Sequence, residues 1–428
     1  MIELLQQVRI IDPGSGIDQI ADVLIVNGEI QAVATQISEI SSDTQIKDCR
    51  GLVLGNGLVD LYSHSGEPGF EERETLLSLL QAAAVGGFTR ISILPDTSPA
   101  IDHPALVAQL QKKAEEQRHR GVEESRHFSF PHLHVWGAIT LDVAGKQLTE
   151  LADLGAAGVV GFTDGKPWEH LGLVLRVLEY LQPLGKPVAF WPGDRLLSAN
   201  GVMREGAEAL RLGLPPIPAS AETTAIASLI ELVASTGTPV HIMRVSTARS
   251  VELIASAKAA GLPITASTTW MHLLLDTKAI KSYHTSLHLE PPLGNSSDLA
   301  ALRAGIKQGI IDAIAIDHAP HTYEEKVQAF AESLPGAIGL ELALPLLWQH
   351  LVETGEFTAL ELWRALSTNP AKCLGQKLST ITPHQPAELT LFNPQETWKI
   401  AQKNLHTLSS NTPWLGQEIK GRVLQTWC

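Results

Sequence analysis

The chain has 428 residues, of which 44% are hydrophobic and 18% charged, and its formal net charge at pH 7 is -14. This composition is typical of a folded globular protein and excludes a largely disordered one. The excess of negative charge argues against binding to duplex nucleic acid, because the sequence supplies no basic face that would neutralise phosphates.

The cysteines and the N-terminal segment indicate the compartment. Cys49, Cys373 and Cys428 are an odd number without metal-like spacing, so we expect neither a disulfide framework nor a thiolate zinc site. Residues 1–9 lack the basic start and apolar core of a signal peptide, and no stretch is apolar for long enough to span a bilayer. The sequence therefore predicts a cytoplasmic protein with no membrane partner.

Both ends of the chain read as short strands. Near the start, β-branched runs at 8–11 and 23–26 are followed by Asn27-Gly28, a strong hairpin signal. Near the end, strand-like runs return at 387–392 and 421–426. We predict that residues 1–55, together with residues 383–428, build one small β-sandwich.

The long middle part, residues 56–382, alternates short apolar runs with amphipathic segments of helical length. This pattern predicts an α/β fold, a parallel (β/α)8 barrel of the TIM type, with its chemistry at the carboxyl ends of the strands. The charge-rich segment 112–126 is expected to form a solvated helix and loop. The apolar runs are residues 90–94, 158–162, 187–191, 239–243, 263–266 and 313–316.

Two predicted strand ends carry candidate metal ligands. After the apolar run 57–59, His64 follows Tyr62 by two positions, and such side chains point the same way on a strand. A His-x-His pair there could hold one cation from one face, but Tyr62 takes the first place. Downstream, the apolar run 311–316 leads into a carboxylate and two imidazoles, Asp317-His318-Ala319-Pro320-His321.

Further short motifs follow one another in a fixed order along nearly the whole chain. In this order and spacing, the set resembles the dihydroorotases, cyclic-amide hydrolases of pyrimidine synthesis within the amidohydrolase superfamily. The resemblance implies a barrel with a small β-sandwich and a metal site at the barrel mouth. The motifs are Glu67-Pro68-Gly69 with Glu74-Thr75, Gly86-Gly87-Phe88-Thr89, Gly137-Ala138-Ile139-Thr140, Thr163-Asp164-Gly165, Val245-Ser246-Thr247, Pro291-Pro292-Leu293, Asp317 to His321, Gly339-Leu340-Glu341 and Asn411-Thr412-Pro413.

The resemblance assigns four positions to the more buried metal of the family: Tyr62, His64, Asp164 and Asp317. A tyrosine stands where the first histidine is usual, so His64, Asp164 and Asp317 remain as a residual site, with Asp317 as general base if the protein is active. If Thr163 rather than Asp164 occupies the bridging position, this site loses a further carboxylate.

The second metal of the family needs two more histidines. Phe190 or Trp191 stands at the first of these positions and Arg244 at the second, and neither an aromatic hydrocarbon nor a guanidinium can coordinate a cation. His241 is expected to be a packed histidine and not a substitute ligand. We predict instead that Arg244 supplies the missing positive charge by bridging Asp317 and Asp164.

The residues implied for substrate recognition are also altered. The family holds the carboxylate of dihydroorotate with an arginine and an asparagine, and here those places are Gly66 and Asp96. Glu290 stands where an asparagine is usual, while His321 is kept. Losing a bidentate arginine and gaining a like charge both disfavour an anionic ligand. His321, Asp96 and Glu290 are therefore predicted to line a degraded pocket.

These observations predict a dihydroorotase-like protein that is non-catalytic and needs no cofactor. The resemblance implies a structural or regulatory partner of aspartate transcarbamoylase. A barrel retained without its chemistry suggests selection on shape, so we expect a homodimer or a complex with that enzyme. One alternative is an active cyclic amidohydrolase with a single zinc ion on His64, Asp164 and Asp317. Another is a sensor that binds a small molecule without turnover.

Overall fold

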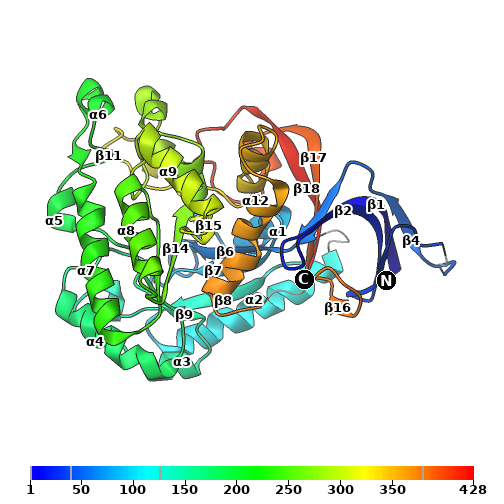
Figure 1. Cartoon of the computed structure of the whole chain (residues 1–428), viewed down its shortest axis with the longest axis horizontal. Coiled ribbons are helices and arrows are strands. Elements are labelled where there is room, and N and C mark those ends of the chain that lie inside the picture. Colours follow the sequence, from blue (N-terminus) through cyan, green and yellow to red (C-terminus); the bar gives the residue numbers. More distant parts are fainter. Residues whose placement is uncertain (1, 39–40, 125–127, 378–379) are drawn as a thin grey trace.

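The barrel consists of eight parallel strands in the order β15-β14-β13-β10-β9-β8-β7-β6 (Figure 1). The computed structural model describes residues 2–38, 41–124, 128–377 and 380–428. The strands are β6 (Leu58–Ser63), β7 (Phe88–Ile93), β8 (His132–Gly137), β9 (Gly161–Phe162), β10 (Val188–Phe190), β13 (Val240–Ile242), β14 (Ile264–Thr269) and β15 (Ala313–Ala315).

At least one helix follows every barrel strand, so the predicted (β/α)8 architecture is confirmed. The helices that follow the eight strands in turn are α1 (Leu76–Val85), α2 (Pro104–Glu124), α3 (Leu151–Ala156), α4 (Leu171–Leu181), α7 (Ser220–Thr236), α8 (Ala248–Ala259), α9 (Ser296–Lys307) and α12 (Ala359–Leu366). The charge-rich segment continues α2 as far as Glu124, and its last residues, 125–126, lie outside the described part.

Hydrogen bonds close the barrel between its first and last strands. The Asp317 amide donates to the Tyr62 carbonyl at 3.1 Å, and the His64 amide donates to the His318 carbonyl at 2.8 Å. Buried apolar side chains such as Leu61, Leu94 and Trp136 fill the barrel beneath its mouth. Strands that are buried on both faces read as continuous apolar runs, which explains why most of them could be recognised.

Two excursions from the regular pattern shape the mouth. Between β10 and α7 the chain forms α5 (Arg195–Ser198), β11 (Met203–Arg204), α6 (Ala207–Leu212) and β12 (Pro216–Ile217). After β15 it forms α10 (Tyr323–Lys326), α11 (Ala343–Leu347), a π-helical turn at Trp348–Val352 and, beyond α12, α13 (Thr368–Cys373). The α5 and α6 excursion lies at the end of the molecule opposite the N-terminal strands (Figure 1).

Strands from both chain ends form one eight-stranded sheet, in the order β16-β3-β2-β1-β5-β17-β18 with β4 paired to β1. Its strands have a buried apolar cluster of their own. Asn27 and Gly28 both have positive φ, 51° and 80°, as a two-residue hairpin turn between β2 and β3 requires. The strands are β1 (Ile2–Asp12), β2 (Ile17–Val26), β3 (Glu29–Ala34), β4 (Gln45–Asp48), β5 (Val53–Asn56), β16 (Gln385–Pro386), β17 (Leu389–Lys399) and β18 (Glu418–Trp427).

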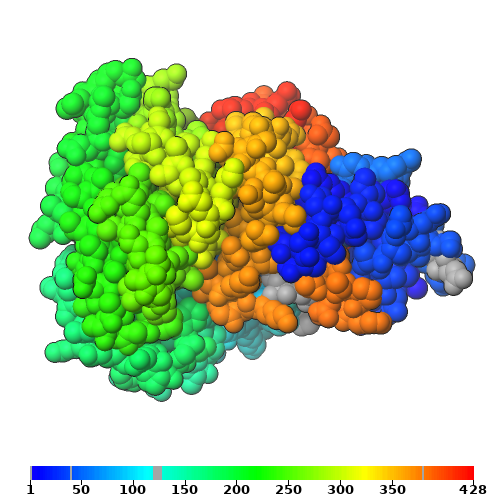
Figure 2. Space-filling model, viewed as in Figure 1, coloured from blue at the N-terminus to red at the C-terminus, as the bar shows by residue number. Residues whose placement is uncertain are grey.

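Figure 2 shows the N-terminal strands, in blue, at one end of the molecule and the α5–α6 segment, in green, at the other. Within the described part of the chain, no helix is both long and apolar enough to cross a membrane.

Candidate functional site

A cavity of about 200 Å³ opens at the carboxyl ends of the barrel strands. Its lining brings together residues from loops that are far apart in the sequence, as expected for this face of a barrel. The polar and aromatic residues among them include His64, Asp96, Lys166, Trp191, Arg244, His272, Glu290 and Asp317.

Arg244 lies at the centre of this mouth and is paired with Asp317. Its Nε and Nη2 donate to the two carboxylate oxygens of Asp317 at 2.8 and 2.6 Å, and its Nη1 donates to the Gly165 carbonyl at 2.9 Å. The Arg244 side chain is only 3% exposed. Burial disfavours the charged form of Arg244, but its attraction to Asp317 and its hydrogen bonds with that carboxylate outweigh this effect and raise the pKa of Arg244. The guanidinium is therefore a fixed cation held by a bidentate ion pair.

Two aromatic rings complete the surroundings of Arg244. Its guanidinium carbon lies 4.6 Å from the ring centre of Trp191 and 5.5 Å from that of Tyr62. The Tyr62 hydroxyl accepts a hydrogen bond from the Arg244 amide at 3.1 Å and is 2.9 Å from Ser267 Oγ. Burial, together with Asp317, raises the pKa of Tyr62 above its ordinary value. Tyr62 is thus a neutral phenol that supports Arg244 and offers no phenolate to a metal.

His64 links Asp96 to the Arg244 pair. Its Nδ1 is 2.6 Å from Asp96 Oδ2, and its Nε2 is 3.2 Å from Arg244 Nη2. Because a guanidinium can only donate, this second contact requires an unprotonated Nε2 and places the ring proton on Nδ1, facing Asp96. His64 Nε2 also lies 3.7 Å from Asp317 Oδ1.

The charges around His64 alter two pKa values. Burial would lower the pKa of His64, but Asp96 and Asp317 outweigh it and raise that pKa. Burial would likewise raise the pKa of Asp96, but His64 outweighs it and lowers that pKa to about 2. Asp96 is therefore an anion committed to His64 and unlike the asparagine that the resemblance leads one to expect.

Asp164 does not join this group. Its carboxylate accepts hydrogen bonds from the Ile139 amide at 2.8 Å, the Thr140 amide at 3.0 Å and the Thr140 hydroxyl at 2.6 Å. The prediction that Arg244 bridges Asp317 and Asp164 is correct for Asp317 and wrong for Asp164. The physical reason is that the neighbouring strand-end loop satisfies Asp164 locally, so Arg244 reaches the Gly165 carbonyl instead.

The residual metal site expected at His64, Asp164 and Asp317 is likewise not assembled. Within the described residues, no three His, Cys, Asp or Glu side chains gather closely enough to hold a metal ion. The donors that remain, His64 Nε2 and the Asp317 carboxylate, both face the Arg244 guanidinium. A divalent cation placed on them would meet a fixed positive charge, so these residues do not fit the metal of the family.

The other candidate residues are dispersed. Phe190 packs edge-on against Trp168, with ring centres 5.3 Å apart. His241 is a packed histidine, as predicted, with its ring nitrogens 2.9 Å from the hydroxyls of Thr265 and Ser267, and burial lowers its pKa to about 3.

Glu290 and His321 lie in different cavities. Glu290 lines the mouth cavity, and burial raises its pKa. His321 Nε2 is 2.9 Å from the Pro335 carbonyl oxygen, and the ring lines a separate cavity beside α10. His321 is therefore not brought together with Asp96 and Glu290.

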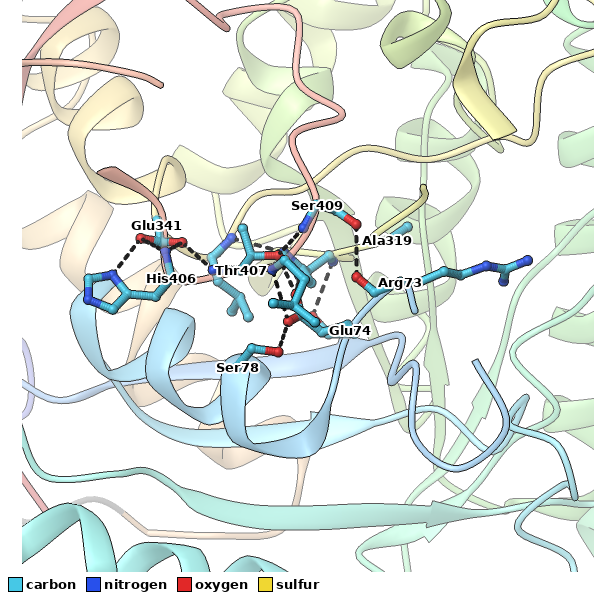
Figure 3. Close-up of polar contacts among 12 residues, drawn as sticks. Arg73, Glu74, Ser78, Ala319, Glu341, His406, Thr407 and Ser409 are labelled. Carbon is cyan, nitrogen blue, oxygen red and sulfur yellow. Dashed lines mark hydrogen bonds and ion pairs between the residues drawn. The ribbon is translucent and has the colours of Figure 1, made fainter. Parts of the chain in front are cut away.

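A polar cluster outside the cavity fixes the loop that carries Asp317 (Figure 3). The buried Glu74 carboxylate accepts from the hydroxyls of Ser78 and Thr407, and one of its oxygens is 3.4 Å from His318 Nε2. The Gly339 amide donates to His318 Nδ1 at 3.1 Å. His318 is thus a structural residue, and sequence reasoning gave Glu74 and Thr407 no role, although Glu74 stood in a recognised motif.

Comparison with solved structures identifies the class of fold. L-hydantoinase (dihydropyrimidinase) from Arthrobacter aurescens superposes with a TM-score of 0.84 at 20% identity, covering 99% of this chain and 96% of that one. Dihydropyrimidinase from Brevibacillus agri gives a TM-score of 0.82 at 21% identity, covering 100% and 94%. At this level of identity the similarity shows the fold alone, the amidohydrolase barrel with its accessory sheet.

Sequence relatives narrow this class. The family model described as "Dihydro-orotase-like" matches residues 51–250, and that of the "Amidohydrolase family" matches residues 214–428. A "Probable dihydroorotase-like protein" of Synechocystis is 45% identical over 98% of both chains. A "Dihydroorotase" of Syntrophus aciditrophicus is 38% identical, covering 99% of this chain and 97% of its own. The chain belongs to the dihydroorotase-like members of the amidohydrolase family.

Proposed function

We propose that this dihydroorotase-like protein does not hydrolyse cyclic amides. The observation that carries the proposal is the bidentate ion pair between Arg244 and Asp317. Hydrolysis of an amide in this family needs an activated water and a carboxylate that takes its proton. The guanidinium cannot generate a hydroxide, and by pairing with Asp317 it makes that carboxylate a poorer base.

The substrate side of the pocket supports the same proposal. An arginine cannot be accommodated at position 66, because even a Cβ on Gly66 would come within 2.2 Å of the Glu74 carbonyl oxygen. Asp96 is an anion bound to His64, so it would repel the carboxylate of dihydroorotate. Both halves of the carboxylate clamp that the resemblance implies are therefore missing.

The proposed role is structural or regulatory, as a homodimer or as a partner of aspartate transcarbamoylase. This follows from the resemblance, and its support is that the barrel, the accessory sheet and the polar cluster around Glu74 are kept while the catalytic groups are replaced. A scaffold that persists without its chemistry is best explained by a function of its surface.

The direct experiment is a dihydroorotase assay in both directions on the chelator-treated protein, with and without added zinc. We expect no turnover from the wild type, and none from Tyr62→His, because Arg244 and the lost clamp remain. The "Dihydroorotase" of Syntrophus aciditrophicus, assayed in parallel, is the positive control. Zinc-dependent turnover by the wild type would overturn the proposal.

The alternative is an active amidohydrolase with a single metal, and it is favoured by the several relatives named "Dihydroorotase" at 36–38% identity. It requires His64 and Asp317 to exchange Arg244 for a metal ion. A sensor function is the other alternative, favoured by the cavity of about 200 Å³ that remains at the mouth. Stabilisation by pyrimidine intermediates in a thermal-shift assay, without turnover, would identify it.

A further inference from the structure

A second and larger cavity, of about 440 Å³, adjoins the mouth cavity and shares Lys166, Trp191 and Glu290 with it. Its far wall is formed by α5, by β11 and by the start of α7, in the excursion between β10 and α7. These elements lie at the end of the molecule away from the accessory sheet (Figure 1). We call this cavity the side chamber.

Three cationic side chains line the side chamber: Lys166, Arg195 and Arg204. Lys166 is exposed, and within the described part of the chain it has neither a hydrogen-bond nor an ion-pair partner, although its positive charge favours the ionised forms of the nearby Asp96 and Asp164. Arg195 is 52% exposed and has only a long contact, 3.5 Å, with the equally exposed Glu169. At least two of the three charges are therefore available to a ligand.

Arg204 differs because it is only 2% exposed. Its Nη2 donates to Ser246 Oγ at 2.7 Å, whereas its Nε has no hydrogen-bond partner among the described residues. A buried guanidinium nitrogen without an acceptor is costly unless something else satisfies it. This unpartnered donor, on a side chain that lines the chamber, is independent evidence that the chamber takes an acceptor group.

Two carboxylates also line the chamber and offset part of this positive charge. Glu222 accepts hydrogen bonds from the amides of Ser246 and Thr247 at 3.0 and 3.1 Å and from the Ser246 hydroxyl, so its lone pairs are committed. It lies 3.8 Å from Arg204 Nη2. Among the described residues of the lining, the other carboxylate is Glu290, which stands at the border with the mouth cavity and interacts electrostatically with Arg195.

We infer that the side chamber binds a small organic anion through a carboxylate or phosphate group, with Lys166 as the principal contact. Arg195 contributes further positive charge, Arg204 offers its unpartnered Nε donor, and the apolar part of the ligand lies beside Trp191. Both groups named are recognised by the same chemistry, charge-assisted hydrogen bonds from ammonium and guanidinium donors. Anion recognition is thereby moved from the clamp positions Gly66 and Asp96 to the side chamber, and this holds whether or not the protein hydrolyses amides.

The test is calorimetric titration of the chelator-treated full-length protein with inorganic phosphate and, separately, with succinate. The ionic strength is held constant, because screening alone would weaken binding. We expect saturable binding at one site for at least one probe, and the tighter probe identifies the anionic group. Lys166→Gln should weaken that binding about tenfold or more, since it removes a charge-assisted hydrogen bond to the anion.

Matched variants distinguish a specific loss of binding from a general effect on folding. Arg195→Gln should also weaken binding, whereas Arg211→Gln should not, because Arg211 is an exposed arginine on α6, paired with Glu208, that does not line the chamber. Arg204→Lys keeps the buried charge. The inference is overturned if neither probe saturates the wild type, or if Lys166→Gln and Arg195→Gln bind as tightly as the wild type. Turnover in the dihydroorotase assay would sink the proposed function and leave this result untouched.

Discussion

Arg244 and Asp317 are both held in the left-handed region of backbone space, with φ of 54° and 52°. A non-glycine residue there costs on the order of 1–3 kcal/mol and persists only where its surroundings fix it. The ion pair, the Gly165 carbonyl and the Tyr62 hydroxyl provide that fixation. At the scale of single residues, the mouth is thus organised around a cation that belongs to the chain itself.

Removing the Arg244 guanidinium should therefore lower the stability of the protein. Arg244→Ala leaves Asp317 and its surroundings without the buried partner, and we expect the free energy of unfolding to fall by about 3 kcal/mol, as measured by urea denaturation. Arg249→Ala is the control, because Arg249 and Glu252 form an exposed pair for which we expect a loss of less than about 0.5 kcal/mol. A loss below about 1 kcal/mol for Arg244→Ala would mean that the pair does not hold the mouth together.

The sequence showed which residues lie near the barrel mouth better than it showed where their side chains point. The position of Arg244 opposite Asp317 was expected from the resemblance, which places both residues at strand ends that meet at one face of the barrel. Asp164 and His321 were expected in the same site, yet Asp164 turns to the amides of Ile139 and Thr140, and His321 turns to Pro335. Loop side chains follow the nearest free donor or acceptor, and the spacing of a motif does not reveal where that partner lies.

At the scale of elements, Asp60 on β6 helps to close the barrel. Its Oδ1 accepts a hydrogen bond from the Ile316 amide, just beyond β15, at 2.9 Å, and its Oδ2 accepts from the Ser63 hydroxyl at 2.5 Å. Desolvation by burial raises the pKa of Asp60 from 3.8 to about 7. The hydrogen bond from Ile316 to β6 is therefore accepted by a carboxyl group that is protonated over much of the acidic range.

A pH dependence of stability follows from this shift. Because the pKa is higher in the folded state, the folded protein binds more protons between pH 3.8 and about 7, and the contribution of Asp60 to stability falls as the pH rises through this window. Asp60→Asn should flatten the decline in unfolding free energy between pH 5 and 7, as measured by urea denaturation. Asp43→Asn, at an exposed carboxylate, should keep the wild-type slope. An unchanged slope in Asp60→Asn would contradict the assignment.

Most barrel strands could be predicted because they are short runs of apolar residues buried on both faces. β8 was not among the predicted runs, since His132 and His134 interrupt its apolar pattern. The α5–β12 excursion was also missed, because elements of two to six residues carry little periodic signal. This excursion forms the wall of the side chamber, so the part of the molecule that we assign to anion binding was invisible in the sequence.

For the whole molecule, the accessory sheet joins segments from the two ends of the chain, and residues near the C-terminus also fix the barrel mouth. Thr407 and Leu408 bind Glu74, and the Asn411 side chain donates to the Ala319 carbonyl at 2.8 Å. The mouth is thus tied to a framework that does not depend on a metal. Such a framework keeps the shape and the surface of the mouth whether or not the protein is catalytic.

At the scale of the whole molecule, the prediction concerns how the protein assembles. We expect the purified protein to be a homodimer by light scattering, or to co-elute with aspartate transcarbamoylase of the same organism when the two are mixed. The reason is the proposed absence of hydrolysis, since a barrel without that chemistry would act through its contacts. A monomer at all accessible protein concentrations, with and without that enzyme, would contradict the proposed structural role.

The measurement that tests the central claim most directly is the zinc content of the protein, determined by equilibrium dialysis against buffered zinc followed by elemental analysis. Because Arg244 already neutralises Asp317 and faces His64, we expect far less than one equivalent of bound zinc in the wild type. His64→Ala should leave that low value unchanged. About one equivalent in the wild type, lost in His64→Ala, would show that a metal displaces Arg244 and would contradict the account.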